Sequence, residues 1–186
     1  MIDFRPFDEQ GNMIRSGRTC AGKKGVVSAG RAEAADIGRS ILQQGGNAID
    51  AAVAVAFAMG VCEPNANGIG GGGFMMIRDG KTGKNVFLDF RENAPANAAP
   101  DMYTPKAPGS NYDKDLGNVY GGKSVGIPGD VAGLLYALEH YGTMTPEQVI
   151  SPAAKLAREG YVVTPLLHGD MAEHATQRKT YGDGWK

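Results

Sequence analysis

Residues 46–92 read GNAIDAAVAVAFAMGVCEPNANGIGGGGFMMIRDGKTGKNVFLDFRE, and this stretch decides how the chain folds. Residues 48–59 are apolar on nearly every side, which predicts a helix buried in the middle of a larger body. Asn47 can cap the start of that helix, and the charge of Asp50 suits its first turn. Gly60 is expected to end it.

A glycine loop, residues 65–73 (NANGIGGGG), follows the helix. Glycine either adopts positive φ angles or lets another backbone approach closely, and the loop is expected to use one or both of these properties. Two apolar runs, residues 74–78 and 84–90, then flank the turn sequence DGKTG. This pattern predicts a β-hairpin.

The glycine loop also satisfies the spacing G-x-G-x-x-G, with Gly68, Gly70 and Gly73 in the three glycine positions. Asp89 lies near the distance at which a ribose-binding acid is expected. A dinucleotide-binding loop must follow a strand and open a helix, whereas here a helix precedes the loop and a strand follows it. The context therefore argues against a nucleotide site.

Arg91 ends the predicted hairpin and has the clearest chemical capacity in the stretch. Its planar guanidinium stays charged and can bind a carboxylate through two parallel hydrogen bonds. The structural alternative is a salt bridge with Asp89 or Glu92. The residues alone leave both interpretations open.

The rest of the chain predicts an N-terminal arm, one further strand and a helical C-terminal third. The fold class expected from this order is α+β. The expected elements are an arm at residues 1–24, a buried strand at 25–29, a helix at 31–44, an irregular excursion at 93–119, and helices at 131–141, from Pro146, from Ser151 and Pro152 to Gly160, and from Pro165 toward His174.

Composition excludes several classes of function. The net charge of -1 and the scattered basic residues argue against nucleic-acid binding. Cys20 and Cys62 form no CxxC pair, so neither a disulfide framework nor a zinc site is expected. His140, His168 and His174 are interpreted as surface histidines without a nearby nucleophile motif. The N-terminus lacks an apolar leader and no apolar run would span a bilayer, which predicts a cytoplasmic protein with no membrane partner unless a leader was removed.

Three segments together resemble the N-terminal part of the large subunit of γ-glutamyltranspeptidases. They are GGNAIDAAVAVAFAMGVCEPNANGIGGGGFMM, LDFRENAP and VGIPGDVAGLLYALEHYGTMTPEQVISPAAKLAREGYVVTP, in the order of the family. The resemblance extends from about Gly25 to Pro165 and assigns residues 25–186 to that part of the subunit. It implies an αββα sandwich of the N-terminal-nucleophile hydrolase type, of which only the N-terminal portion is present.

The resemblance also implies an activity. In this family the precursor cleaves itself, and the new N-terminal threonine of a small subunit attacks the γ-glutamyl bond of glutathione or a related compound. Water, an amino acid or a peptide then accepts the γ-glutamyl group. The nucleophile lies beyond Lys186, so the expected partners are the remainder of the large subunit and a small subunit. No metal or organic cofactor is implied, and no catalytic residue is expected within this chain.

One functional residue carries over by resemblance. Arg91 aligns with the DFRE arginine that binds the α-carboxylate of the γ-glutamyl group, whereas the run 70–73 is given only a structural role near the site. Asn65 and Asn93 replace the residues that are usual after EP and DFRE. Substrate preference therefore stays open, and the alternatives are an acylase acting on a β-lactam side chain or polyglutamate, or a non-catalytic binding module.

Overall fold

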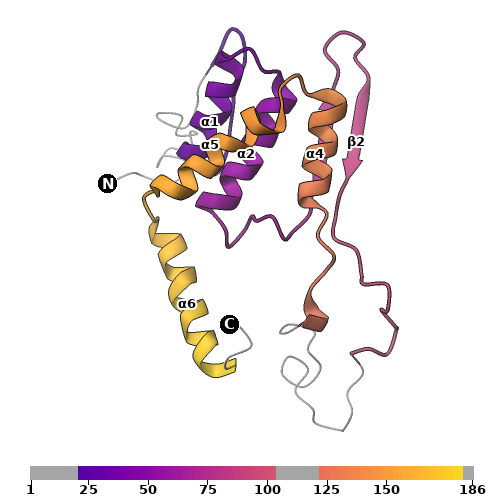
Figure 1. The fold of residues 1–186 in the computed structure, drawn as a ribbon, viewed down its shortest axis with the longest axis vertical. Coiled ribbons are helices and arrows are strands. Elements are labelled where there is room, and N and C mark those ends of the chain that lie inside the picture. Colours follow the sequence, from indigo (N-terminus) through magenta and orange to yellow (C-terminus); the bar gives the residue numbers. More distant parts are fainter. Residues whose placement is uncertain (1–20, 104–121, 182–186) are drawn as a thin grey trace, which may run out of the picture.

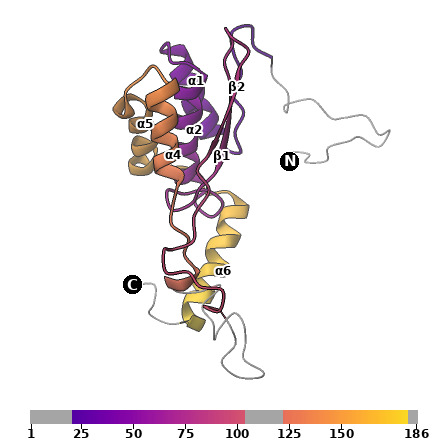
Figure 2. The same cartoon turned by 90° about the vertical axis from the view of Figure 1, so that its right-hand side faces the viewer.

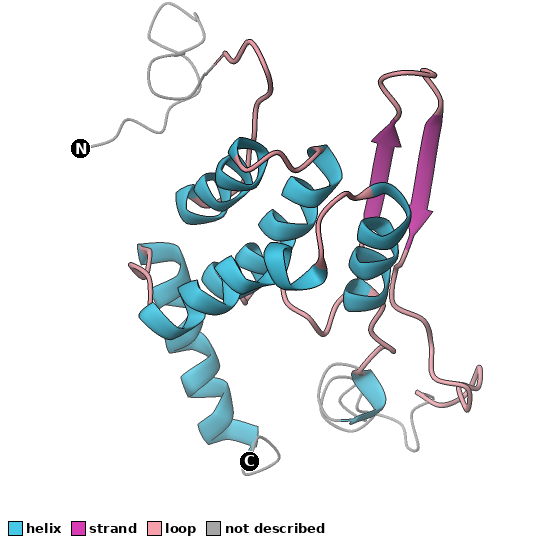
Figure 3. Cartoon of the chain, turned by 45° about the horizontal axis from the view of Figure 1, so that its top comes forward, coloured by secondary structure: helices cyan, strands magenta, loops and turns pink. Residues whose placement is uncertain are grey.

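The computed structural model describes residues 21–103 and 122–181, and Figure 1 shows four of its helices beside a two-stranded hairpin, with the last helix extending away below them. The elements are α1 (Ala32–Gln43), α2 (Ala48–Cys62), β1 (Phe74–Arg78), β2 (Asn85–Asp89), the short 3-10 helix η1 (Gly122–Ser124), α4 (Asp130–Tyr141), α5 (Pro146–Glu159) and α6 (Pro165–Tyr181). Figure 3 distinguishes these helices and strands by colour.

Helix α2 forms the centre of the core, as its sequence predicts. It contacts α1, α4 and α5, and its buried face includes Val53, Ala54 and Ala58, which are fully inaccessible to solvent. Alanines on this face let the neighbouring helices approach closely. Leu134 and Leu138 of α4 belong to one apolar cluster with Val53 and Ala54.

The start of α2 is fixed by a buried acid. Asn47 Oδ1 accepts hydrogen bonds from the amides of Ile49 and Asp50, while the Asp50 carboxylate accepts one from the amide of Asn47. That carboxylate also accepts bonds from the amide and hydroxyl of Thr143 and from the amide of Met144. Asp50 therefore joins the first turn of α2 to the loop between α4 and α5, with its charge fully hydrogen-bonded.

The hairpin packs one face on the helices, and Figure 2 shows it along one side of them. Strands β1 and β2 pair antiparallel, and the inward side chains Met75 and Leu88 pack against the core. The outward side chains Phe74 and Phe87 stack with ring centroids 5.7 Å apart and remain more than half exposed. The predicted hairpin is confirmed, with one face buried and one face open within the described chain.

Three expectations about element boundaries are wrong. Residues 25–29 are not a strand, because no described segment offers a ladder of backbone hydrogen bonds, and Val26 is 55% exposed. Helix α2 continues through Gly60 to Cys62, because glycine without a positive φ does not break a helix and Pro64 is the first residue that does. Pro152 lies inside the continuous helix α5, which the Thr145 capping box has already started.

The predicted start of α5 is confirmed. Thr145 and Gln148 form the predicted capping box, and Pro146 occupies the first position of α5. Residues 93–103 are irregular as expected, while residues 1–20 of the arm and 104–119 of the excursion lie outside the described residues. None of the helices in the described ranges combines the length and hydrophobicity needed to cross a bilayer.

Replacing the buried acid should destabilise the fold strongly. Asp50→Asn places an amide N–H₂ against backbone donors and removes the charge, so the free energy of unfolding should fall by about 3 kcal/mol. Urea denaturation of the two proteins measures this difference. Asp36→Asn is the control, because Asp36 is exposed and pairs only with Arg39 on its own helix. A fall no larger than that of Asp36→Asn would contradict the role given to Asp50.

The same acid should make stability depend on pH. Burial alone would raise the pKa of the Asp50 carboxyl, but its hydrogen bonds to Thr143, Asn47 and Met144 outweigh burial and hold this pKa below its usual value. A lowered pKa stabilises the fold above the unfolded value of about 3.9, and this contribution disappears as the pH falls through the folded value. Urea denaturation across acidic pH should show that the free energy of unfolding falls more steeply with decreasing pH in the native chain than in Asp50→Asn. Equal slopes would contradict the assignment.

Candidate substrate-binding site

The glycine loop, which lies between α2 and β1, is hydrogen-bonded both to the end of the hairpin and to the start of α4. The carbonyl of Gly71 accepts hydrogen bonds from the amides of Gly129 and Asp130, at 3.0 and 2.9 Å. Gly73 and Phe90 exchange two further backbone hydrogen bonds, of 3.0 and 3.4 Å, just past the strands. These bonds fix the backbone on both sides of the segment that carries Arg91.

The loop depends on close backbone approach rather than on positive φ. A Cβ atom on Gly72 would lie 2.5 Å from the carbonyl oxygen of Phe90 and 2.7 Å from the amide nitrogen of Glu92. Both distances are far shorter than a carbon atom tolerates. The glycines with positive φ in the described chain all lie outside this loop, at Gly45, Gly83 and Gly160. Of the two geometries expected for the loop, the structure uses close backbone approach.

Arg91 projects from this fixed backbone with 64% of its side chain exposed. Its Nη1 atom lies 3.3 Å from Oε2 of Glu92, and its amide donates to Oδ1 of Asp89 at 3.0 Å. The predicted salt bridge therefore exists with Glu92, while Asp89 binds only the backbone of Arg91. Within the described residues this is the only ion pair of the guanidinium, so one edge of its planar fork remains available to a ligand carboxylate.

One acid, Glu92, contacts the Arg91 side chain from the protein side. Glu92 is 28% exposed, and its Oε2 atom is inaccessible to solvent and accepts no hydrogen bond from any described residue. Burial, and secondarily the charge of Glu92, raise the pKa of the Asp130 carboxyl at the first turn of α4. The attraction between Arg91 and the buried oxygen of Glu92 holds the guanidinium beside the glycine loop.

The sequence alone did not reveal that Asp130 and Gly71 belong to this site. The Pro-Gly-Asp run before α4 marks a helix start, but nothing in its spacing indicates a bond to the glycine loop. The loop itself follows helix α2 and precedes strand β1, so the arrangement required of a dinucleotide fingerprint is absent.

The other candidate residues form no second site. His140 stacks on Tyr136, with ring centroids 3.8 Å apart, on the exposed side of α4. His168 and His174 are exposed, as predicted. Cys62 is buried, and burial raises the pKa of its thiol, whereas Cys20 lies outside the described residues. Residues 21–103 and 122–181 contain no group of His, Cys, Asp and Glu suited to holding a metal ion.

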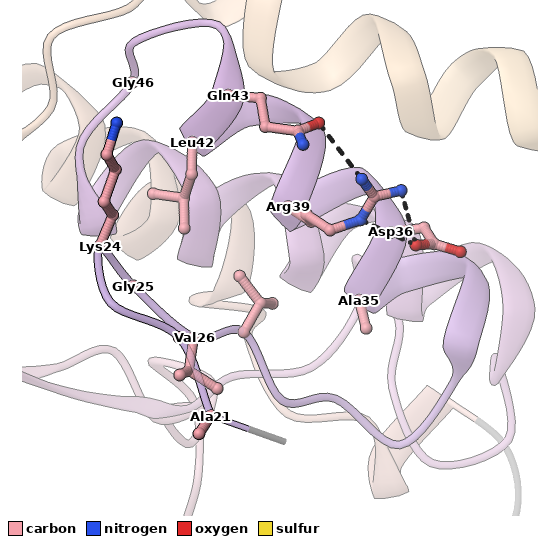
Figure 4. A pocket seen from close by; sticks show the side chains of 12 residues that line it. Ala21, Lys24, Gly25, Val26, Ala35, Asp36, Arg39, Leu42, Gln43 and Gly46 are labelled. Carbon is pink, nitrogen blue, oxygen red and sulfur yellow. Dashed lines mark hydrogen bonds and ion pairs between the residues drawn. The ribbon is translucent and has the colours of Figure 1, made fainter.

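A cavity of about 730 Å³ lies between residues 21–27 and helix α1, away from Arg91. Figure 4 shows its charged wall, where the Arg39 guanidinium bonds to Asp36 at 3.1 Å and to Gln43 at 3.3 Å. These polar groups satisfy one another along one face of α1. The cavity is therefore a weaker candidate than the Arg91 site for binding a charged substrate.

Comparison with known proteins places this geometry in a family. The sequence model described as Gamma-glutamyltranspeptidase matches residues 34–184. The chain belongs to the γ-glutamyltranspeptidase family. The match confirms the predicted family and covers the glycine loop, the hairpin and Arg91.

Individual relatives agree with the family assignment. A glutathione hydrolase proenzyme of Bacillus subtilis (strain 168) is 45% identical over 153 residues, which are 82% of this chain and 26% of the relative. An acylase ACY 1 proenzyme of Pseudomonas sp. (strain V22) is 40% identical over 161 residues, 85% of this chain and 29% of that protein.

A solved structure confirms the fold. The γ-glutamyltranspeptidase of Helicobacter pylori superposes with a TM-score of 0.79 at 38% identity, covering 89% of this chain and 46% of that chain. The predicted α+β fold, a portion of an N-terminal-nucleophile hydrolase, is therefore correct. The chain spans about a quarter of the length of the curated relatives it matches. The division at residue 24 stays a prediction.

Adding one methyl group to the glycine loop should test the geometry of the site. Gly72→Ala forces the backbone of Phe90 and Glu92 away, so the free energy of unfolding should fall by about 1 to 3 kcal/mol. Gly70→Ala is the matched control, since nothing lies within 4 Å of a Cβ atom there. Urea denaturation compares the two variants, and equal stabilities would contradict the close approach described at Gly72.

Proposed function

We propose that this chain is part of a γ-glutamyltransferase or γ-glutamyl hydrolase. The enzyme transfers the γ-glutamyl group of glutathione or a related compound to water, an amino acid or a peptide through a threonine acyl-enzyme. The threonine comes from a part of the protein outside this sequence, in a small subunit that assembles with the large one. The names of the relatives, a glutathione hydrolase and a γ-glutamyltranspeptidase, support this reaction class.

Arg91 carries the proposal. Its guanidinium is exposed at the end of a rigid hairpin and is held on one side by Glu92. The open edge offers two parallel N–H donors, the arrangement that binds a carboxylate most specifically. We assign it the α-carboxylate of the γ-glutamyl donor.

Arg91 contributes to the reaction by holding the donor in place. A γ-glutamyl donor held by its amino-acid end has its γ-carbonyl at a fixed distance from the anchor, which is the length of the glutamyl side chain. Fixing that end orients the carbonyl for attack. The donor then loses its translational and rotational freedom on binding rather than on reaching the transition state. The rigid backbone around Gly71 and Phe90 matters because a displaced anchor would displace the reacting carbonyl.

The test places Arg91→Ala and Arg91→Lys in a complete enzyme. A chimera of the Bacillus subtilis relative carries this chain in place of its own matching segment, and hydrolysis of a γ-glutamyl anilide is followed. Arg91→Ala should lower kcat/KM about 100-fold, mainly through KM, because two charge-assisted hydrogen bonds of about 1.5 kcal/mol each are lost. Arg91→Lys should restore only part of the loss, since an ammonium group cannot bind in two parallel bonds.

Arg39→Ala in the same chimera is the matched control, because Arg39 is an exposed arginine paired along its own helix. It should leave the donor kinetics unchanged. Self-cleavage of every chimera is checked on a gel, so that a folding failure is distinguished from a lost anchor. Native donor kinetics in a processed Arg91→Ala chimera would remove the proposal.

The likeness to acylase ACY 1 supports a second candidate, an acylase that removes the side chain of a β-lactam or acts on polyglutamate. A glutaryl amide lacks the α-amino acid end that Arg91 would hold, whereas glutathione has one. A donor panel on the complete protein that includes glutathione, a glutaryl amide and polyglutamate separates them. A preference for the glutaryl amide over glutathione would favour the acylase.

A further inference from the structure

A second cavity of about 610 Å³ lies at the opposite end of the hairpin from Arg91. Its walls are the β1–β2 turn, the first turn of α2 and Tyr141 at the end of α4. Figure 1 shows the turn of the hairpin at the far end from the chain that leaves β2. Arg91 is separated from the Arg78–Asn85 pair by six residues of extended chain, or about 20 Å.

The charge of this cavity is positive. Arg78, Lys81 and Lys84 line it, and the one acid among its lining residues is Asp79. The Asp79 carboxylate is engaged by its own turn, where Oδ1 accepts the amides of Lys81 and Thr82 at 2.8 and 2.7 Å. Three cations against one engaged carboxylate attract an anion.

The positive charge comes from side chains of the hairpin rather than from the end of a helix. Asn47 already caps the amides of Ile49 and Asp50, and the Asp50 carboxylate is directed to the loop after α4. Arg78 uses Nη1 to bind the Gly83 carbonyl and the Asn85 side chain, at 3.1 and 3.2 Å. These bonds hold the Arg78 guanidinium on the outward face of β1, while the ammonium groups of Lys81 and Lys84 lie on long flexible side chains and can reach an anion at the rim.

The remaining lining is apolar. Ile49, Ile77, Val86 and Tyr141 contribute to the walls, and Ile77 is buried. A volume of this size lies within the usual range of about 300 to 1,000 Å³ for small-molecule sites, which combine apolar walls with a few polar groups. An inorganic anion contacts only the charged residues at the rim, whereas an anion with an apolar ring also buries that ring against the apolar wall.

We propose that this cavity binds a small organic anion that has an apolar or aromatic body and one phosphate or carboxylate group. The anionic group contacts Lys81 and Lys84 at the rim, and the ring lies against Ile49, Val86 and Tyr141. This site is separate from the Arg91 anchor and does not depend on the proposed γ-glutamyl reaction.

Isothermal titration of the 186-residue chain with phenyl phosphate tests the proposal, with benzoate, inorganic phosphate and phenol as comparison ligands. Phenyl phosphate or benzoate should bind at least about tenfold more tightly than phosphate and phenol, since only they engage both the rim and the wall. The double variant Lys81→Ala, Lys84→Ala should weaken the better ligand about tenfold or more. Raising the salt concentration should weaken it further.

The matched control is Lys123→Ala with Lys155→Ala, which removes two exposed lysines outside the cavity. Its affinity should equal that of the native chain, and so should that of Arg91→Ala. Thermal unfolding of each variant verifies that the fold is retained. Absence of saturable binding, or an unchanged affinity in the Lys81, Lys84 double variant, would overturn the proposal. An equal loss of affinity in the control or in Arg91→Ala would also overturn it. The same holds if inorganic phosphate or phenol binds as tightly as both ring anions.

Discussion

The site depends on the fit of Phe90 among three glycines. A Cβ atom on Gly129 would lie 2.1 Å from the Phe90 carbonyl oxygen, and one on Gly133 would lie 2.1 Å from Cγ of its ring. Gly72 approaches the same carbonyl from the glycine loop. No larger residue fits any of these positions without moving the backbone, so loop, hairpin and helix α4 meet in one arrangement. Arg91 follows directly and takes its place from that packing.

A second constraint keeps the helices that support this packing in register. Asp50 joins the start of α2 to Thr143 and Met144 beyond the end of α4. Since the other end of α4 bonds to Gly71, one end of this helix is tied to the start of α2 and the other to the glycine loop. The ionised carboxylate is tolerated in the core because every bond it accepts comes from a well-placed donor. Asp50, although far from Arg91 in the structure, thus contributes to the fixed position of Arg91.

Local signals were readable from the sequence and long-range contacts were not. The capping residues Asn47 and Thr145 act on amides two or three positions away, so their patterns predicted the starts of α2 and α5 correctly. The bonds from Asp50 to Thr143 and from Gly71 to α4 join distant segments and left no local pattern. The strand expected at residues 25–29 failed for the same reason, because a strand requires a partner that its own residues do not specify. For Arg91, the sequence left open a structural salt bridge or a ligand-binding role. The structure has the salt bridge to Glu92, and one edge of the guanidinium remains for binding a ligand.

A crystal structure of the complete chimera with glutamate bound tests the central claim most directly. The account predicts two guanidinium nitrogens of Arg91 at about 2.7 to 2.9 Å from the two α-carboxylate oxygens, with Glu92 still beside Nη1. Glutamate bound with its α-carboxylate on other residues, and Arg91 turned into solvent, would contradict it.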